Sequence, residues 1–259
     1  VGPFIGKLLI QHLVTSDPSP AYVGRVAAAF NNNGTGVRGE MRAVLRAILL
    51  DPEARGSRKS DPAYGKLREP VQHLTNILRM FKVGPGRYSN DLPALPPASC
   101  ENRSDGLFAW MLKDSGQEIW YPPTVFSYYS PFAVVPGTTA LGPEFALAHT
   151  GSAVAQNNLI YRFTMGEGLS FDQPTASQPY PWVPCGTATD ISEAVAWAES
   201  DASGNTLVEG LNSKMMHGTM SDEMKQKLKD AIALEAPADW KARTAVFLVA
   251  SSSQYQIQR

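Results

Sequence analysis

The sequence has few of the residues that build metal centres. It contains 2 cysteines and 4 histidines in 259 residues, and none of them lies at the spacing of a metal-binding motif. A mononuclear site built mainly from histidine is therefore disfavoured. We expect neither a metal ion nor another cofactor.

Long apolar runs and an excess of one charge are also missing. No run approaches the roughly 18 to 20 apolar residues that a membrane-spanning helix needs, and the formal net charge is −1. We therefore expect no membrane span and no nucleic-acid partner. The chain begins at Val1, and the first residues lack the features of a signal peptide, so we expect a piece of a longer precursor.

Alternating strand patterns are nearly absent, whereas helical patterns recur along the chain. Ser19 and Pro20 form a helix start, and Tyr22, Val26 and Phe30 follow at four-residue spacing. Similar patterns cover 37–55, 67–81, 142–163, 190–200, 205–218, 221–234 and 238–256. The predicted fold class is all-α, an irregular multi-helix domain with long loops rich in proline and aromatic residues.

Two of these helices show clearly which residues should face the core. The expected core face of the helix in 37–55 carries Met41, Val44, Leu45, Ile48 and Leu49, with Arg38, Arg42 and Arg46 opposite. The expected core face of 67–81 carries Val71, Leu74, Leu78 and Phe81. In 221–234, Ser221 is the expected N-cap.

The composition divides the chain into three regions of one expected domain, 1–259. A helical subdomain covers 1–82, an irregular region covers 83–142, and a second helical region covers 143–259. We expect the second helical region to open with a helix that begins at Pro143. Glu144 would then lie near the positive end of that helix dipole.

The irregular region contains an unusual aromatic segment. Between Trp120 and Pro136 the sequence has six aromatic residues and four prolines, and proline stiffens the backbone so that ring positions are fixed. Such rings can stack on a sugar or another ligand with a flat face. They can equally anchor the loop to the helical core. The residues that we select as candidate ligand contacts are Trp120, Tyr121, Tyr128, Tyr129 and Trp182.

The two cysteines, Cys100 and Cys185, both lie in proline-rich loops. In an oxidising compartment a disulfide between them would close a long loop and stabilise the fold by roughly 4 kcal/mol. The alternative is a pair of unrelated buried thiols.

Four residues are candidates for catalysis. Asp114, Glu118 and Glu144 lie near the aromatic segment, and a glycosidase needs two carboxyl groups roughly 5 to 10 Å apart. His149 lies near an acid and hydroxyl residues, but the chain has no nucleophile elbow of the type GxSxG. Helix capping and solvated charge are the alternative explanation of the carboxylates.

Four blocks of the sequence resemble one bacterial family. They read HLVTSDPSPAYVGRVAAAFNNNGTGVRGEMRAVLRAILLDPEAR, KLREPVQHLTNILR, PPTVFSYYSP and FLVASSSQYQIQR. Together they resemble the carboxy-terminal half of proteins with domain of unknown function 1800. The resemblance implies a helical, exported protein, periplasmic or secreted, often encoded beside a sulfatase-like partner. The family has no agreed activity, so the resemblance assigns no catalytic residue.

Two functions follow as hypotheses. The first is a binding or structural module that contacts a carbohydrate or a protein partner through its aromatic residues. The second is a hydrolase that acts on polysaccharide through a carboxylate pair near the aromatic segment. Two acids converging in an aromatic cleft would favour the hydrolase, and an aromatic surface without such acids would favour the module.

Overall fold

The structure is a computed structural model that describes residues 1–61, 64–81, 83–85, 111–125, 127–165, 187–235 and 237–259. The described residues are predominantly helical, so the predicted all-α class is confirmed. The chain forms two compact units, and each unit combines segments far apart in the sequence. Unit 1 comprises Val1–Glu69, Pro122–His149 and Ile257–Arg259, and unit 2 comprises Pro70–Tyr121 and Thr150–Gln256. Each unit has a hydrophobic core of its own.

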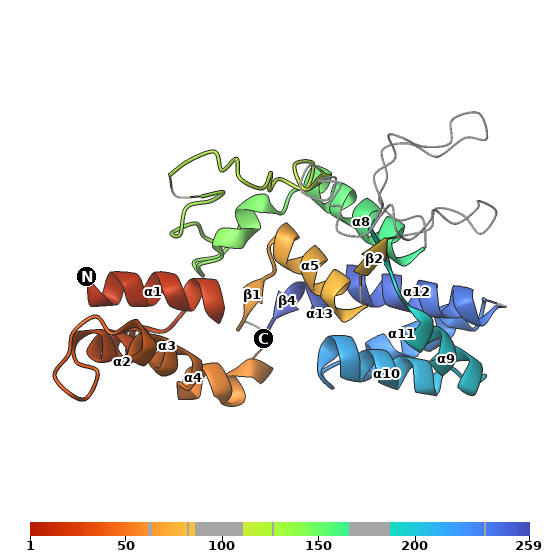
Figure 1. Ribbon diagram of the computed structural model, residues 1–259, viewed down its shortest axis with the longest axis horizontal. Coiled ribbons are helices and arrows are strands. Elements are labelled where there is room, and N and C mark those ends of the chain that lie inside the picture. The colour runs from red at the N-terminus through yellow and green to blue at the C-terminus, as the bar shows by residue number, and fades with distance from the viewer. Residues whose placement is uncertain (62–63, 82, 86–110, 126, 166–186, 236) are drawn as a thin grey trace. The chain divides into compact units, whose positions relative to one another are not determined.

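Unit 1 is built on a set of helices from the first part of the chain (Figure 1). Its elements are α1 (Gly2–Leu13), α2 (Pro20–Asn31), α3 (Met41–Leu49), α4 (Pro52–Arg55), the 3-10 helices η1 (Ser57–Ser60) and η2 (Pro143–Leu147), and the strands β1 (Lys66–Leu67) and β4 (Ile257–Gln258). Helix α2 begins as predicted, because the Ser19 hydroxyl accepts a hydrogen bond from the Tyr22 amide at 3.1 Å. The predicted core residues Tyr22, Val26 and Phe30 are all buried.

Helix α3 differs from the prediction in the face that it buries. Val44 and Ile48 are buried, but Met41, Leu45 and Leu49 are exposed, so their assignment to the core was wrong. Helices α1 and α2 pack against α3. The apolar arc of α3 is wider than the surface that these neighbours cover, and its outer part therefore faces solvent.

Strands β1 and β4 join two segments that are almost 200 residues apart. They pair antiparallel, with Lys66 opposite Gln258, and the Gln258 amide donates to the Leu13 carbonyl at 3.2 Å. Gly65, just before β1, has a φ of +130°, and a Cβ there would lie 2.6 Å from the Gln258 carbonyl oxygen. Only glycine permits both the backbone conformation and this close approach.

The helix expected to run from Pro143 to residue 163 is interrupted, which corrects the prediction. The residues form the short 3-10 helix η2, and α8 begins only at Thr150. Glu144 lies in the first turn of η2 and is buried. The chain also passes from unit 1 to unit 2 between His149 and Thr150.

Unit 2 is a helical assembly in which α12 packs against α8, α9, α10 and α11 and against the short α13 that follows it. Its elements are α5 (Pro70–Met80), β2 (Val83–Pro85), α8 (Thr150–Thr164), β3 (Thr187–Thr189), α9 (Ser192–Ser200), α10 (Asn205–Met216), α11 (Asp222–Ile232), α12 (Ala238–Ser251) and α13 (Ser253–Gln256). The predicted core residues Leu74, Leu78 and Phe81 are buried, and Val71 packs against the same core. Strands β2 and β3 pair antiparallel. Ser221 caps α11 as predicted, because its hydroxyl accepts from the Met224 amide.

Candidate functional site

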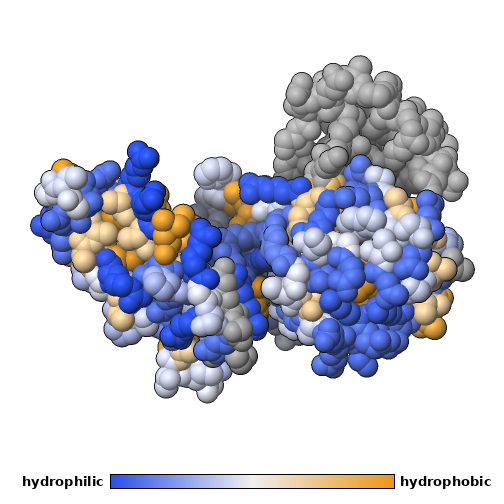
Figure 2. All heavy atoms as spheres, turned by 90° about the horizontal axis from the view of Figure 1, so that it is seen from below, coloured by the Kyte–Doolittle hydropathy of each residue, from blue (hydrophilic) through white to orange (hydrophobic). Residues whose placement is uncertain are grey.

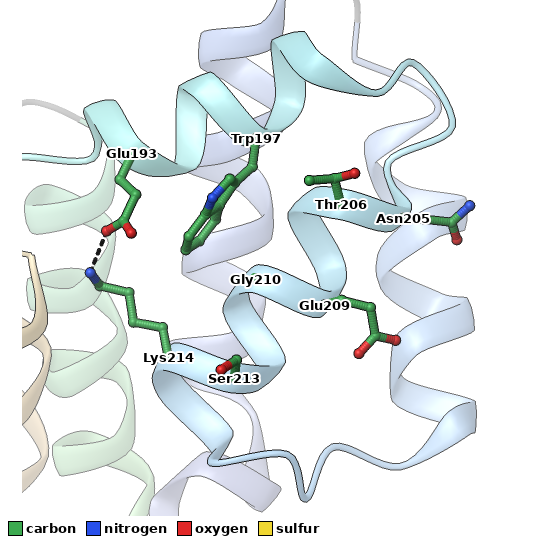
Figure 3. Close-up of a pocket in the computed structure, with 8 residues that line it drawn as sticks. All are labelled: Glu193, Trp197, Asn205, Thr206, Glu209, Gly210, Ser213 and Lys214. Carbon is green, nitrogen blue, oxygen red and sulfur yellow. Dashed lines mark hydrogen bonds and ion pairs between the residues drawn. The ribbon is translucent and has the colours of Figure 1, made fainter.

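A groove of about 630 Å³ lies between helices α9 and α10 of unit 2 (Figure 3). The residues that line this α9–α10 groove are Glu193, Trp197, Asn205, Thr206, Glu209, Gly210, Ser213 and Lys214. Two residues come from α9 and six from α10. The groove therefore depends on how these two consecutive helices are held together.

A short turn fixes the connection between α9 and α10. The Asp201 carboxylate accepts hydrogen bonds from the amides of Ser203 at 2.9 Å and Thr206 at 3.0 Å. Hydrogen bonds from the Ser203 side chain and from these amides lower the pKa of Asp201 to about 2. Gly204 has a φ of +76°, and a Cβ there would lie 2.5 Å from the Cδ1 atom of Ile232. The turn thus needs glycine at this position and sets the first residues of α10 at one end of the groove.

The Trp197 side chain forms the aromatic wall of the groove. Its indole extends from α9 toward α10 and lies against the backbone at Gly210 (Figure 3). A Cβ at residue 210 would lie 2.5 Å from Cε3 and 2.7 Å from Cδ2 of Trp197. Glycine inside a helix lowers stability by roughly 0.5–1 kcal/mol relative to alanine. Here the missing side chain makes room for the indole.

The charges in the groove are compensated. The Glu193 carboxylate forms an ion pair with the Lys214 ammonium, drawn as a dashed line in Figure 3. The Glu209 carboxylate lies 2.8 Å from the Lys225 ammonium, and the Asn212 amide donates to its other oxygen at 3.1 Å. Hydrogen bonding from Lys225 and then Asn212 lowers the pKa of Glu209. Each carboxylate of the lining therefore has a lysine beside it, and the lining has no unpaired carboxylate.

Comparison with known proteins identifies the family. A model of the family described as "Protein of unknown function (DUF1800)" matches residues 1–257. The chain belongs to this family. The family prediction is thus confirmed, although the match does not single out the carboxy-terminal half of its members. No curated protein and no solved structure matches the chain.

The predicted aromatic contacts of this DUF1800 chain have different environments. Trp120 and Tyr121, in unit 2, are 88% and 72% exposed, and Trp120 has a φ of +72°. Such a backbone conformation is strained for a bulky residue. Tyr128 and Tyr129, in unit 1, are half-buried. Trp182 and the cysteines Cys100 and Cys185 lie outside the described residues. The contact and disulfide roles of these residues stay predictions.

Two of the predicted residues, Tyr129 and Glu144, meet in a buried group of polar side chains in unit 1. We name this group the Lys66 cluster, and its members are Ser16, Lys66, Glu69, Tyr129 and Glu144. The Lys66 ammonium lies 3.4 Å from Glu144 and 4.0 Å from Glu69. The Ser16 hydroxyl donates to Glu144 at 2.7 Å. Burial raises the pKa of the Tyr129 hydroxyl, and the nearby Glu69 carboxylate, to which it is hydrogen-bonded, raises it further.

The remaining candidate catalytic residues do not join this cluster or the groove. Asp114 is exposed, and Glu118 lies 3.9 Å from the Lys113 ammonium, both in unit 2. His149 is exposed and belongs to unit 1. The catalytic role of Asp114, Glu118, Glu144 and His149 stays a prediction.

Sequence reasoning missed the α9–α10 groove and the Lys66 cluster. A usable signal for the groove was Gly210, because a glycine inside a helical pattern indicates a packing or functional requirement. The tryptophan of the preceding helix, Trp197, was the natural partner. The pairing of Lys66 with Glu144 joins residues far apart in the sequence, and no local pattern predicts it.

Two kinds of feature are missing from the part of the chain that the structure describes. Histidine, cysteine, aspartate and glutamate side chains do not gather there in groups of three or more that could hold a metal ion. None of the helices described there has both the length and the hydrophobicity that crossing a bilayer requires.

Proposed function

We propose that the protein is a binding module and that the α9–α10 groove binds a neutral sugar ring of a carbohydrate. One observation carries the proposal: the Trp197 indole forms a wall of a groove in which each carboxylate has a lysine partner. The volume of about 630 Å³ is within the range of ligand-binding pockets.

The groove offers a partner for the apolar face of a sugar and for its hydroxyl groups. A pyranose ring has an apolar face of C–H groups, which stacks on an indole, and a rim of hydroxyl groups that donate and accept hydrogen bonds. Asn205, Thr206 and Ser213 offer neutral polar groups along α10. A charged ligand would need an unpaired charge of opposite sign in the groove. The carboxylates of Glu193 and Glu209 are both paired with lysines, so neither is free to bind a cation.

The hydrolase alternative has less support in this groove. A glycosidase needs one carboxyl group that stays protonated near neutral pH, which requires a raised pKa. Hydrogen bonding lowers the pKa of Glu209, and Glu193 is paired with an ammonium group. Both features favour binding without cleavage of the glycosidic bond.

The other predictions extend the proposal. The exposed rings of Trp120 and Tyr121 supply a further aromatic contact surface. Export to the periplasm or the medium, and a sulfatase-like partner, rest on the family resemblance. Fractionation of cells that produce the native precursor tests export, and recovery of the protein only in the cytoplasmic fraction would exclude it.

Affinity electrophoresis tests sugar binding. Native gels are prepared with neutral polysaccharides such as dextran, xylan or mixed-linkage β-glucan, and the full chain is expected to be retarded by at least one of them. Trp197→Ala should lower the apparent affinity, measured from the retardation, by about 30-fold. Tryptophan residues at the centre of a contact commonly contribute most of the binding energy. Trp240→Ala, which removes a partly exposed tryptophan on α12 outside the groove, is the matched control and should bind as the wild type does.

Two results would contradict the proposal. Migration unaffected by every polysaccharide would exclude a sugar-binding module of this kind. Equal retardation of wild type and Trp197→Ala would remove the groove as the site. A reducing-end assay on the retarding polysaccharide separates the alternatives, since release of new reducing ends would support the hydrolase.

A further inference from the structure

Helix α3 of unit 1 carries an exposed apolar row. Met41, Leu45 and Leu49 repeat every four residues and are 43%, 38% and 44% exposed, and Leu50, just past the helix end, is also exposed. Residues at this spacing lie on one face of a helix. Figure 2, which views the molecule from the side of α2, α3 and α4, shows apolar residues gathered over this unit beside hydrophilic ones.

Exposed arginines accompany this row. Arg42 and Arg46 each follow a residue of the row and are exposed. At the end of the row, Leu49 helps to line a small cavity of about 180 Å³ together with Arg55 and Arg259. The Arg55 guanidinium also donates to the Leu49 carbonyl at 2.7 Å, so it is held beside the end of α3. Arg42 and Arg46 thus lie about 100° around the helix from the row, so they border it and do not lie opposite it as predicted, and Arg55 lies at its end.

Two carboxylates just after α3 are turned inward, and that of the half-buried Glu40, just before it, accepts a hydrogen bond within unit 1. Asp51 is buried and accepts two hydrogen bonds from Arg25 at 2.7 Å. Glu53 is buried and accepts from the Ser19 amide and hydroxyl. These acids are satisfied within unit 1, which leaves positive charge on its outer face.

The charge of the two units shows the same asymmetry. By sequence, unit 1 has 11 Lys and Arg against 7 Asp and Glu, a net charge of +4, and unit 2 has 12 against 17, a net charge of −5. The two values add to the −1 of the whole chain. The net charge of the whole chain is thus close to zero although unit 1 is basic. Exposed arginines of this unit flank the apolar row of α3.

We propose that α3 is a contact surface for an anionic phospholipid membrane. A helix with an apolar face beside a basic face lies in the bilayer interface, where the apolar side chains enter the acyl boundary and the basic ones meet the headgroups. Arginine suits this role because its guanidinium binds phosphate oxygens in a bidentate manner. A typical protein partner would need roughly 20–30 residues on this side, whereas a lipid surface adapts to a short row.

Vesicle sedimentation tests the proposal with the full chain. Vesicles of phosphatidylcholine alone are compared with vesicles that also contain phosphatidylglycerol, at low and high salt. The wild type is expected to sediment only with the anionic vesicles and to be released by salt. Arg42→Gln/Arg46→Gln should lower the partition coefficient by about 20-fold, on the scale expected for two basic residues near a charged surface. Leu45→Glu should abolish sedimentation.

Matched controls use exposed residues of unit 2. Arg79→Gln/Lys227→Gln removes two exposed cations elsewhere, and Leu234→Glu changes an exposed leucine outside α3. Both should sediment as the wild type does. A melting curve for each variant confirms folding, and the two arginines, being exposed, can be replaced without disturbing the core.

Three outcomes would overturn the proposal. In the first, the wild type does not sediment with anionic vesicles. In the second, the unit 2 controls lose as much binding as the α3 variants. In the third, the chain binds soluble poly-L-glutamate through Arg42 and Arg46 but does not bind vesicles. This result would indicate that the surface binds an acidic protein.

Discussion

The Lys66 ammonium lies 3.4 Å from the Glu144 carboxylate, and both side chains are almost completely buried in unit 1. The remaining polar atoms of the pair are also satisfied, because Ser16 donates to Glu144 and Lys66 donates to the His12 carbonyl. A buried ion pair persists only when its geometry and hydrogen bonds offset the loss of hydration. This pair therefore ties η2 to β1 within the unit.

Replacement of Lys66 by methionine is expected to lower the free energy of unfolding by about 3–5 kcal/mol, because two buried carboxylates lose their cation. Urea denaturation measures the change. Lys225→Met is the control, since its partner Glu209 is exposed and exposed pairs contribute at most about 1 kcal/mol. If both variants lose the same small amount, the Lys66 cluster does not stabilise unit 1.

Gly210→Ala is expected to displace the Trp197 indole. Helix propensity alone would make this change stabilising by roughly 1 kcal/mol, but the new Cβ would overlap the ring. We expect lower stability, a red-shifted tryptophan emission and weaker sugar binding. Gly24→Ala on α2 is the control, because nothing lies within 4 Å of its added Cβ, and it should raise stability. A Gly210→Ala protein as stable as Gly24→Ala would contradict the packing described here.

Tyr64→Phe is expected to raise stability by about 1 kcal/mol. The Tyr64 hydroxyl is buried, and among the described residues it has no hydrogen-bond partner, so removing it relieves a desolvation penalty. Tyr22→Phe provides the contrast. The Tyr22 hydroxyl donates to the Ile48 carbonyl at 2.7 Å, so its loss should be destabilising. Thermal unfolding of the two variants should show shifts of opposite sign.

Asp201 should contribute to the acid sensitivity of unit 2. Its pKa in the folded chain is about 2, below the usual 3.8. The ionised carboxylate therefore stabilises the folded state fully above the usual pKa, and this contribution is lost as the pH falls toward 2. Asp201→Asn is expected to reduce the slope of stability against pH in that window, and Ser203→Ala should reduce it in part. Identical slopes for all three proteins would show that the turn does not depend on the charge.

Local features of the fold were predictable from the sequence. The cap at Ser19 and the buried face of α2 follow from hydrogen-bonding chemistry and helical spacing, both of which act within a few residues. The uncovered row of α3 was not predictable, because periodicity shows which residues are apolar and not how much of that face a neighbour covers.

The candidate site was even less accessible to sequence reasoning. The predicted candidate Glu144 is a buried partner of Lys66, a contact between residues far apart in the chain. The groove depends on the absence of a side chain at Gly210, which gains meaning only when Trp197 lies opposite. Such contacts arise from tertiary packing, which the sequence does not show. An aromatic-rich segment is visible in the composition, whereas the role of a single glycine is not.

The pairing of β1 with β4 has a consequence for how the protein is made. Residues 66–67 are synthesised before unit 2, but their partners at 257–258 follow only after all of unit 2 has been synthesised. Contacts between such distant residues form slowly, and domains otherwise fold in the order of their synthesis. The unit that emerges first is therefore expected to be completed last, with its edge open to chaperones while the rest of the chain is translated.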